Sequence, residues 1–246
     1  RQPLYVYNST SSTAPLVFNS RIIDNPAGAA VQLVLGGVSN NAVTLAGSNS
    51  YSAGTVINGA SLVLAAGGSL GAGPISLYGG SFTQIAGGLL NAASTLTLVG
   101  SSSFTLAAGV SNTLAGLVFN NIGGTNTPIL STGGILTLLG DLTASSNNPA
   151  TLALLTGTLD FAGASRTLTV TPIASNGITF APFTETLNIS AVIPSGTLTV
   201  AGGGVLRLGG ANTFTGGLTV NASGVAAAAN TSLTTLVVAG SGLASS

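Results

Sequence analysis

The sequence predicts an all-β protein built as a parallel β-solenoid. Three observations lead to this prediction: short apolar runs alternate with a period of two, one longer sequence unit returns along the chain, and glycine-rich links separate the runs. A period of two places successive side chains on opposite faces of a strand, so one face of each run is expected to be buried.

The clearest strands are four short words in which Leu, Ile or Val alternates with Thr: "TLTL" at 95–98, "ILTL" at 135–138, and "TLTV" at 167–170 and 197–200. Gly, Asn and Ser follow most such runs, as turns require. By the same criterion we expect strands at 31–35, 61–64, 104–106, 117–119, 152–155, 178–180, 187–189, 205–208 and 218–220. The segment nearest to a helix, 225–230, is too short to form one by itself.

Residues 43–77 align without a gap with residues 206–240. The pairs that define the unit are a leucine, a glycine, an asparagine, an aromatic residue, a second glycine and a second asparagine: Leu45 with Leu208, Gly47 with Gly210, Asn49 with Asn212, Tyr51 with Phe214, Gly54 with Gly217, and Asn58 with Asn221. Repetition of this kind is typical of solenoids, in which equivalent residues stack. We expect structural roles for all twelve residues.

Other all-β folds agree less well with the segments that connect the predicted strands. Sandwiches join alternating runs by two-residue hairpins such as Asn-Gly, and the clear candidate here is Asn58-Gly59 inside the repeat. Residues 1–30 are richer in Pro, Tyr and charge than the rest. We therefore divide the chain into an atypical N-terminal cap or docking arm at 1–30 and a solenoid domain at 31–246.

Composition excludes much chemistry. The chain of 246 residues is 45% hydrophobic and 3% charged, with formal net charge zero and neither His nor Cys. Disulfides, imidazole proton transfer and most transition-metal sites are therefore excluded, and we expect no cofactor. A basic surface for nucleic acid is lacking. No apolar run approaches the length of a membrane-spanning helix, so we expect no membrane insertion by this segment.

The remaining catalytic candidates are carboxylates. Asp141 and Asp160 stand about one coil apart, where they could face each other as the two carboxylates of a glycosidase. Each also adjoins a glycine or a short loop, where an aspartate ordinarily serves a turn, and this structural interpretation is the stronger. Tyr51 and Phe214 have two interpretations as well: platforms for a bound sugar or, more simply, aromatic caps on the core at a repeated corner.

The unit "LRLGGANTFTGGLTV" at 206–220 resembles the passenger-associated repeat of bacterial autotransporters, in which a leucine-alternating strand precedes G-x-N-x-aromatic-x-G-G. The copy at 43–64 departs from this pattern at Ala53 and Val56. The two copies cover about a third of the chain. The resemblance implies a right-handed parallel β-helix that is exposed on, or released from, a bacterial cell, and it implies no particular activity.

These observations together lead to two functional expectations. The first is a non-catalytic extracellular structural protein, a β-helical stalk or a filament or surface-layer subunit that self-associates end-on or laterally, because its outward residues are small and neutral. The second is an adhesin fragment that binds glycans or a host surface. An enzyme would depend on Asp141 and Asp160 alone, and we expect none.

Overall fold

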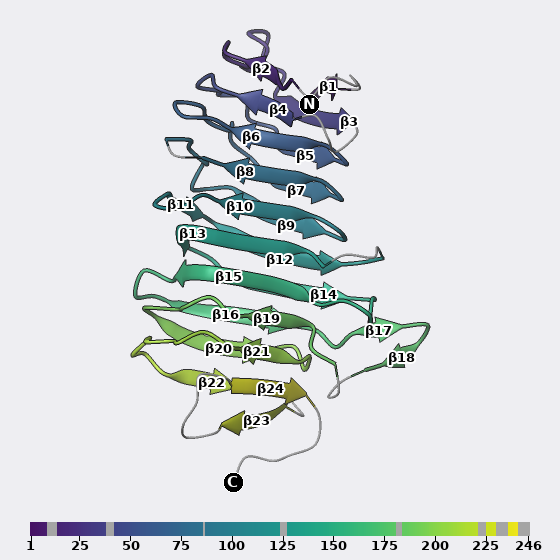
Figure 1. The fold of residues 1–246 in the computed structure, drawn as a ribbon, viewed down its shortest axis with the longest axis vertical. Helices are drawn as coiled ribbons and strands as arrows, with labels where there is room; N and C mark the ends of the chain where they lie inside the picture. Colours follow the sequence, from purple (N-terminus) through teal and green to yellow (C-terminus); the bar gives the residue numbers. More distant parts are fainter. Residues whose placement is uncertain are drawn as a thin grey trace.

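The computed structural model describes residues 1–8, 14–37, 42–85, 87–123, 127–180 and 184–220, together with the strands at 225–229 and 236–240. The chain winds into a parallel β-solenoid, so the predicted fold class is confirmed. Figure 1 shows a rod in which the windings lie one below another, with β1 and β2 near one end of the long axis and β23 and β24 near the other.

Two long sheets form the walls of this solenoid, and most windings contribute one strand to each sheet. Sheet A contains ten strands in spatial order: β1 Gln2–Asn8, β3 Val31–Gly37, β5 Thr55–Asn58, β7 Ile75–Tyr78, β9 Thr95–Val99, β12 Gly116–Asn121, β14 Leu142–Ser146, β16 Ser165–Val170, β20 Thr197–Ala201 and β22 Leu218–Val220. All pairings within sheet A are parallel.

Sheet B faces sheet A across the core. Its strands in spatial order are β2 Leu16–Phe18, β4 Ala42–Leu45, β6 Ser61–Leu64, β8 Ser81–Gln84, β10 Ser103–Leu106, β13 Ile129–Leu138, β15 Ala153–Asp160, β19 Leu187–Ile189, β21 Leu206–Leu208, β24 Leu236–Gly240 and β23 Val225–Ala229, with β11 Ser111–Leu114 paired beside β13. The pairings of β21 with β24 and of β24 with β23 are antiparallel. Residues 225–229, the nearest approach to a helix in the sequence, are thus a strand.

The core consists of inward side chains that stack in register from winding to winding. One row in sheet B is formed by residues paired directly across adjacent strands: Val43, Leu62, Phe82, Phe104, Leu130, Leu155, Ile189 and Leu208. Every member of this row is buried, and the rings of Phe82 and Phe104 lie with centroids 5.0 Å apart. Burial of such rows is the main source of cohesion in the fold.

The clear Asn-Gly candidate for a hairpin turn in the sequence, Asn58-Gly59, does not form a hairpin. Asn58-Gly59 forms a corner between β5 in sheet A and β6 in sheet B, and only Gly59 has a positive φ there. A two-residue hairpin turn of type I′ needs positive φ at both residues. Asn176 and Gly177 meet that condition, with φ of 51° and 76°. They join β17 Ala174–Ser175 to β18 Ile178–Thr179, an antiparallel pair that projects from the side of the rod (Figure 1).

The windings differ in length along the rod. Near the N-terminal end, Ser61 and Ser81 are neighbours across adjacent windings and are 20 residues apart in the sequence. In the winding that carries the β17–β18 hairpin, the neighbours Gly163 and Ser195 are 32 residues apart. Extra residues leave the wall as loops, so the inward rows continue unbroken.

Residues 1–30 contribute the first strand of each sheet, because β1 pairs with β3 and β2 pairs with β4. The loop that follows β2 is held by Asp24, whose Oδ1 accepts hydrogen bonds from the backbone N–H groups of Val31 (2.7 Å) and Ser52 (2.9 Å). Hydrogen bonds to Ser52 and Val31 favour the ionised carboxylate and lower the pKa of Asp24.

Candidate functional site

The repeated unit forms a corner of the winding, and its asparagine is bonded to the winding before it. Asn49 Oδ1 accepts the N–H of Ile22 at 2.8 Å, and the next residue, Ser50, donates its N–H to the carbonyl of Ile22 at 2.9 Å. The second copy repeats both bonds: Asn212 Oδ1 accepts the N–H of Ile193 at 2.9 Å, and Thr213 donates to the Ile193 carbonyl at 3.0 Å. The asparagine amides therefore bind the backbone of a neighbouring winding.

The glycines at this corner allow close contact between windings. A Cβ atom at Gly47 would lie 2.4 Å from the carbonyl oxygen of Ser20, and one at Gly210 would lie 2.0 Å from that of Ala191. Both distances are shorter than any real contact of a Cβ atom. A side chain at either position would therefore push the two windings apart.

The aromatic residue of the unit packs against the core. Tyr51 is fully buried and its hydroxyl lies 2.6 Å from Thr55 Oγ1. Burial raises the pKa of Tyr51, because the ionised phenolate would lose its hydration. Phe214 is half-buried and packs against the same core. Tyr51 thus presents no ring face to a ligand, whereas part of the Phe214 side chain is accessible.

The last pair of the unit is Asn58 and Asn221. Asn58 is exposed at the end of β5, with its neighbours Gly36 and Tyr78 in the adjacent strands of sheet A. Asn221 lies outside the described residues.

Asp141 and Asp160 are each engaged locally. Asp141 Oδ1 accepts the N–H of Thr167 at 2.8 Å. Asp160 Oδ1 accepts the N–H of Ala162, two residues later, and the hydroxyl of Ser195 on the next winding. These bonds fix corners of the solenoid, and no hydrogen bond joins the two aspartates.

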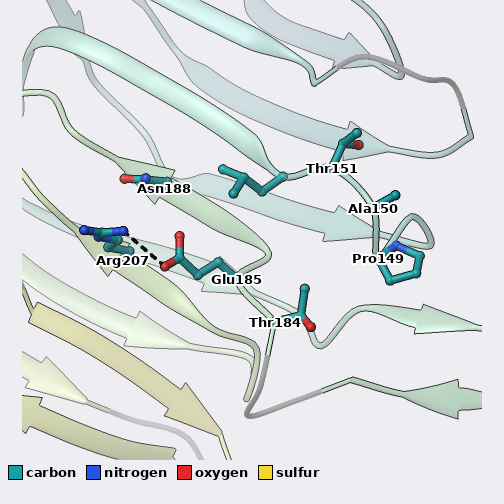
Figure 2. Close-up of a pocket in the computed structure, with 8 residues that line it drawn as sticks. Pro149, Ala150, Thr151, Thr184, Glu185, Asn188 and Arg207 are labelled. Carbon is teal, nitrogen blue, oxygen red and sulfur yellow. Dashed lines mark ion pairs between the residues drawn. The ribbon is translucent and has the colours of Figure 1, made fainter.

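A surface depression of about 340 Å³ lies where β19 and β21 meet the segments 149–152 and 184–185. Glu185 and Arg207 form an ion pair on one side of it, with Oε1 and Nη1 3.5 Å apart, and Pro149 to Thr151 lie on the other side (Figure 2). Asn188 is paired in register with Arg207, and its Oδ1 is buried without a hydrogen-bond partner among the described residues.

This depression offers a limited set of chemical groups. Its lining contains one carboxylate, held by the guanidinium, whereas ordinary glycoside hydrolysis uses two. An ion pair as exposed as this one contributes about 1 kcal/mol or less to stability. Sequence reasoning did not find this ion pair, because Glu185 and Arg207 come together only through the winding of the chain.

A second depression, of about 540 Å³, lies on the outer face of sheet A across β1, β3 and β5. We call it the tyrosine trough and define it by Tyr5, Tyr7, Val34, Gly36, Gly37, Asn58 and Gly59. Sequence reasoning noted the tyrosines in the first thirty residues without assigning them a site. The available signal was the spacing of Tyr5 and Tyr7, two residues apart and therefore on one face of a strand.

Among the described residues, no three acidic, His or Cys side chains gather as a metal site would require, and no helix is long and apolar enough to cross a membrane. In comparisons with known proteins, no family model, curated protein or solved structure matches this chain.

Proposed function

We propose that this chain is a non-catalytic structural subunit outside a bacterial cell, a β-solenoid that associates laterally through the outer face of sheet B. The extracellular location is supported by the resemblance of residues 206–220 to the autotransporter repeat. Lateral association is supported by the chemistry of one outer surface.

That surface is the outer face of sheet B, whose first six strands contain no charged residue. One outward row runs across seven strands through residues paired in register: Val17, Thr44, Val63, Thr83, Thr105, Ser131 and Thr156. The neighbouring row contains Ala42, Ser61, Ser81, Ser103 and Ile129. Neither row carries a charge over these strands, although the second row continues through Leu154 and Asn188 to Arg207. Charged side chains are the usual means by which β-proteins prevent association of their sheets. This neutral face is the observation that carries the proposal.

Placing charge on this face tests the proposal. We expect the wild-type protein to form larger species as its concentration rises, and the double variant Thr83→Lys/Thr105→Lys to remain monomeric in sedimentation velocity. Thr97→Lys, on the opposite sheet, is the matched control and should associate like the wild type. A wild-type protein that stays monodisperse at high concentration, in sedimentation and in negatively stained images, would show the proposal to be wrong.

The second candidate function is glycan binding, as in an adhesin. One observation favours it, the tyrosine trough on sheet A.

A further inference from the structure

The tyrosine trough combines accessible aromatic rings with a floor that includes three glycines, Gly36, Gly37 and Gly59. Tyr5 and Tyr7 are 73% and 69% exposed, although tyrosine is a large and partly apolar residue. Gly36 lies directly opposite Tyr7 in the adjacent strand. A Cβ atom at Gly36 would come 3.3 Å from Cδ2 of Tyr7, so the ring leans over the glycine. The trough therefore has an aromatic wall and an open floor.

The strand register extends the trough along the rod. Tyr7, Gly36, Asn58 and Tyr78 are successive neighbours in one outward row of β1, β3, β5 and β7. Tyr78 is 47% exposed. Three steps between strands separate the two tyrosines, a length of about 14 Å. An elongated ligand can contact a tyrosine at each end and Asn58 between them.

The polar groups of the trough are neutral. Its lining contains no charged residue. Asn58 is exposed, so the donor and acceptor groups of its side-chain amide are accessible to solvent. The phenol hydroxyls of Tyr5 and Tyr7 add further donors and acceptors. A matching ligand has an apolar face for the rings and hydroxyl groups for the amide, and it has no charge that would need a partner.

We propose that the tyrosine trough binds an uncharged oligosaccharide. The C–H face of one pyranose ring lies on Tyr7 above Gly36, its hydroxyl groups bond to the Asn58 amide, and a further sugar reaches Tyr78. The volume is within the range of small-molecule sites, which combine apolar walls with a few polar groups that fix orientation. This inference gives the second candidate function a specific site and ligand class, and it does not depend on lateral association through sheet B.

Calorimetric titration with cellohexaose, laminarihexaose, mannohexaose and chitohexaose tests the site. The titration is made at a concentration where the protein is monomeric by sedimentation. We expect at least one of the four probes to bind. Tyr7→Ala and Asn58→Ala should each weaken that binding by about tenfold or more, because each removes a central contact. Gly36→Ala should weaken it as well, since its methyl group displaces the Tyr7 ring from the floor.

Leu89→Ala is the matched control, because Leu89 is 61% exposed and is not part of the trough. It should bind the probe as the wild type does. All the altered side chains except Gly36 are exposed, so unchanged melting temperatures will show that the variants are folded. Failure of all four probes to bind, or binding that Tyr7→Ala and Asn58→Ala leave unchanged, would overturn the proposal. If Tyr7→Ala instead abolished self-association while no probe bound, the trough would be a contact between copies.

Discussion

The two copies of the repeated unit have similar sequences but different surroundings in the solenoid. Both copies bond to the winding before them in the same way: Asn49 and Asn212 each accept one N–H from that winding. The backbone is also the same, with φ of 89° at Gly54 and 90° at Gly217. The local sequence therefore determines the shape of the corner and its contact with the preceding winding.

The copies differ in their contacts with the following winding. Asn49 also donates from Nδ2 to the carbonyl of Ser69 at 2.8 Å, on the winding that comes next. Tyr51 is fully buried, whereas Phe214 is half-buried. A Cβ atom at Gly54 would lie 2.4 Å from the carbonyl oxygen of Pro74, while one at Gly217 would meet nothing within 4 Å. Among the described residues, the first copy therefore has contacts with the following winding that the second copy lacks.

Truncation of the aromatic residue should show the largest difference between the copies. Tyr51→Ala removes a fully buried ring and is expected to lower the free energy of unfolding by about 3–5 kcal/mol. Phe214→Ala should cost roughly half as much or less, because its ring is already partly hydrated. Urea denaturation followed by circular dichroism measures both. Equal losses would contradict the difference in burial.

Alanine in place of the second glycine should separate backbone strain from crowding. Both variants place alanine at a positive φ, which costs about 1 kcal/mol or somewhat more. Gly54→Ala must also displace the carbonyl of Pro74, which adds about 1–3 kcal/mol. Gly217→Ala should have no such additional cost, because a Cβ atom at Gly217 would meet nothing within 4 Å. The difference between their unfolding free energies measures contact with the following winding, and a difference near zero would mean that this contact adjusts freely.

Loss of the first asparagine should give a smaller contrast. Asn49→Ala leaves the N–H of Ile22 and the carbonyl of Ser69 without their partners, and we expect a loss of about 2 kcal/mol. Asn212→Ala leaves one N–H unpaired and should cost about 1 kcal/mol. Thermal unfolding of both variants beside wild type is the measurement. A larger loss in Asn212→Ala would be inconsistent with the bonds described.

The smallest predicted effect is that of pH on stability, because few groups in the chain titrate. The folded pKa of Asp24 is lowered, so its contribution to stability is present above the ordinary aspartate pKa and is lost as pH falls through the lower folded value. The folded pKa of Tyr51 is raised, so its contribution is present below the ordinary tyrosine pKa and is lost as pH rises through the higher folded value. Melting temperature should be nearly constant between about pH 5 and 9.

Two variants test this assignment. Tyr51→Phe should reduce the loss of melting temperature above about pH 10, and Asp24→Asn should reduce the loss below about pH 4. The aromatic residue of the second copy, Phe214, cannot ionise, so the alkaline effect belongs to the first copy alone. A steep change in melting temperature within the plateau would disagree with these assignments.

Much of the fold could be predicted because the signals for a strand are local. The predicted strands at 61–64, 187–189 and 218–220 have the bounds found in the structure. The segment at 178–180 also contains a strand, β18, but it belongs to a hairpin outside the walls. Its Asn-Gly turn was present in the sequence at Asn176-Gly177 and was overlooked in favour of Asn58-Gly59. Sequence alone does not show which Asn-Gly pair places both residues at positive φ.

The tyrosine trough was harder to predict because it depends on register. Tyr7, Gly36 and Asn58 are unequally spaced in the sequence and become neighbours only because β1, β3 and β5 pair without a shift. Loops of different length between strands change the spacing without changing the rows. The period-two pattern identifies which residues point outward, but the length of each winding decides which of them meet.

In the N-terminal part of the rod, each residue contacts mainly the residues about twenty positions before and after it in the sequence, as Ser61 and Ser81 do. In such an array, order can spread from one completed turn to the next. The chain can therefore fold progressively from one end, each finished edge serving as the template for the segment that follows. A force that pulls its two ends apart would unwind it in successive steps, and each step would release the length of one winding, 20 residues at Ser61 and 32 residues at Gly163.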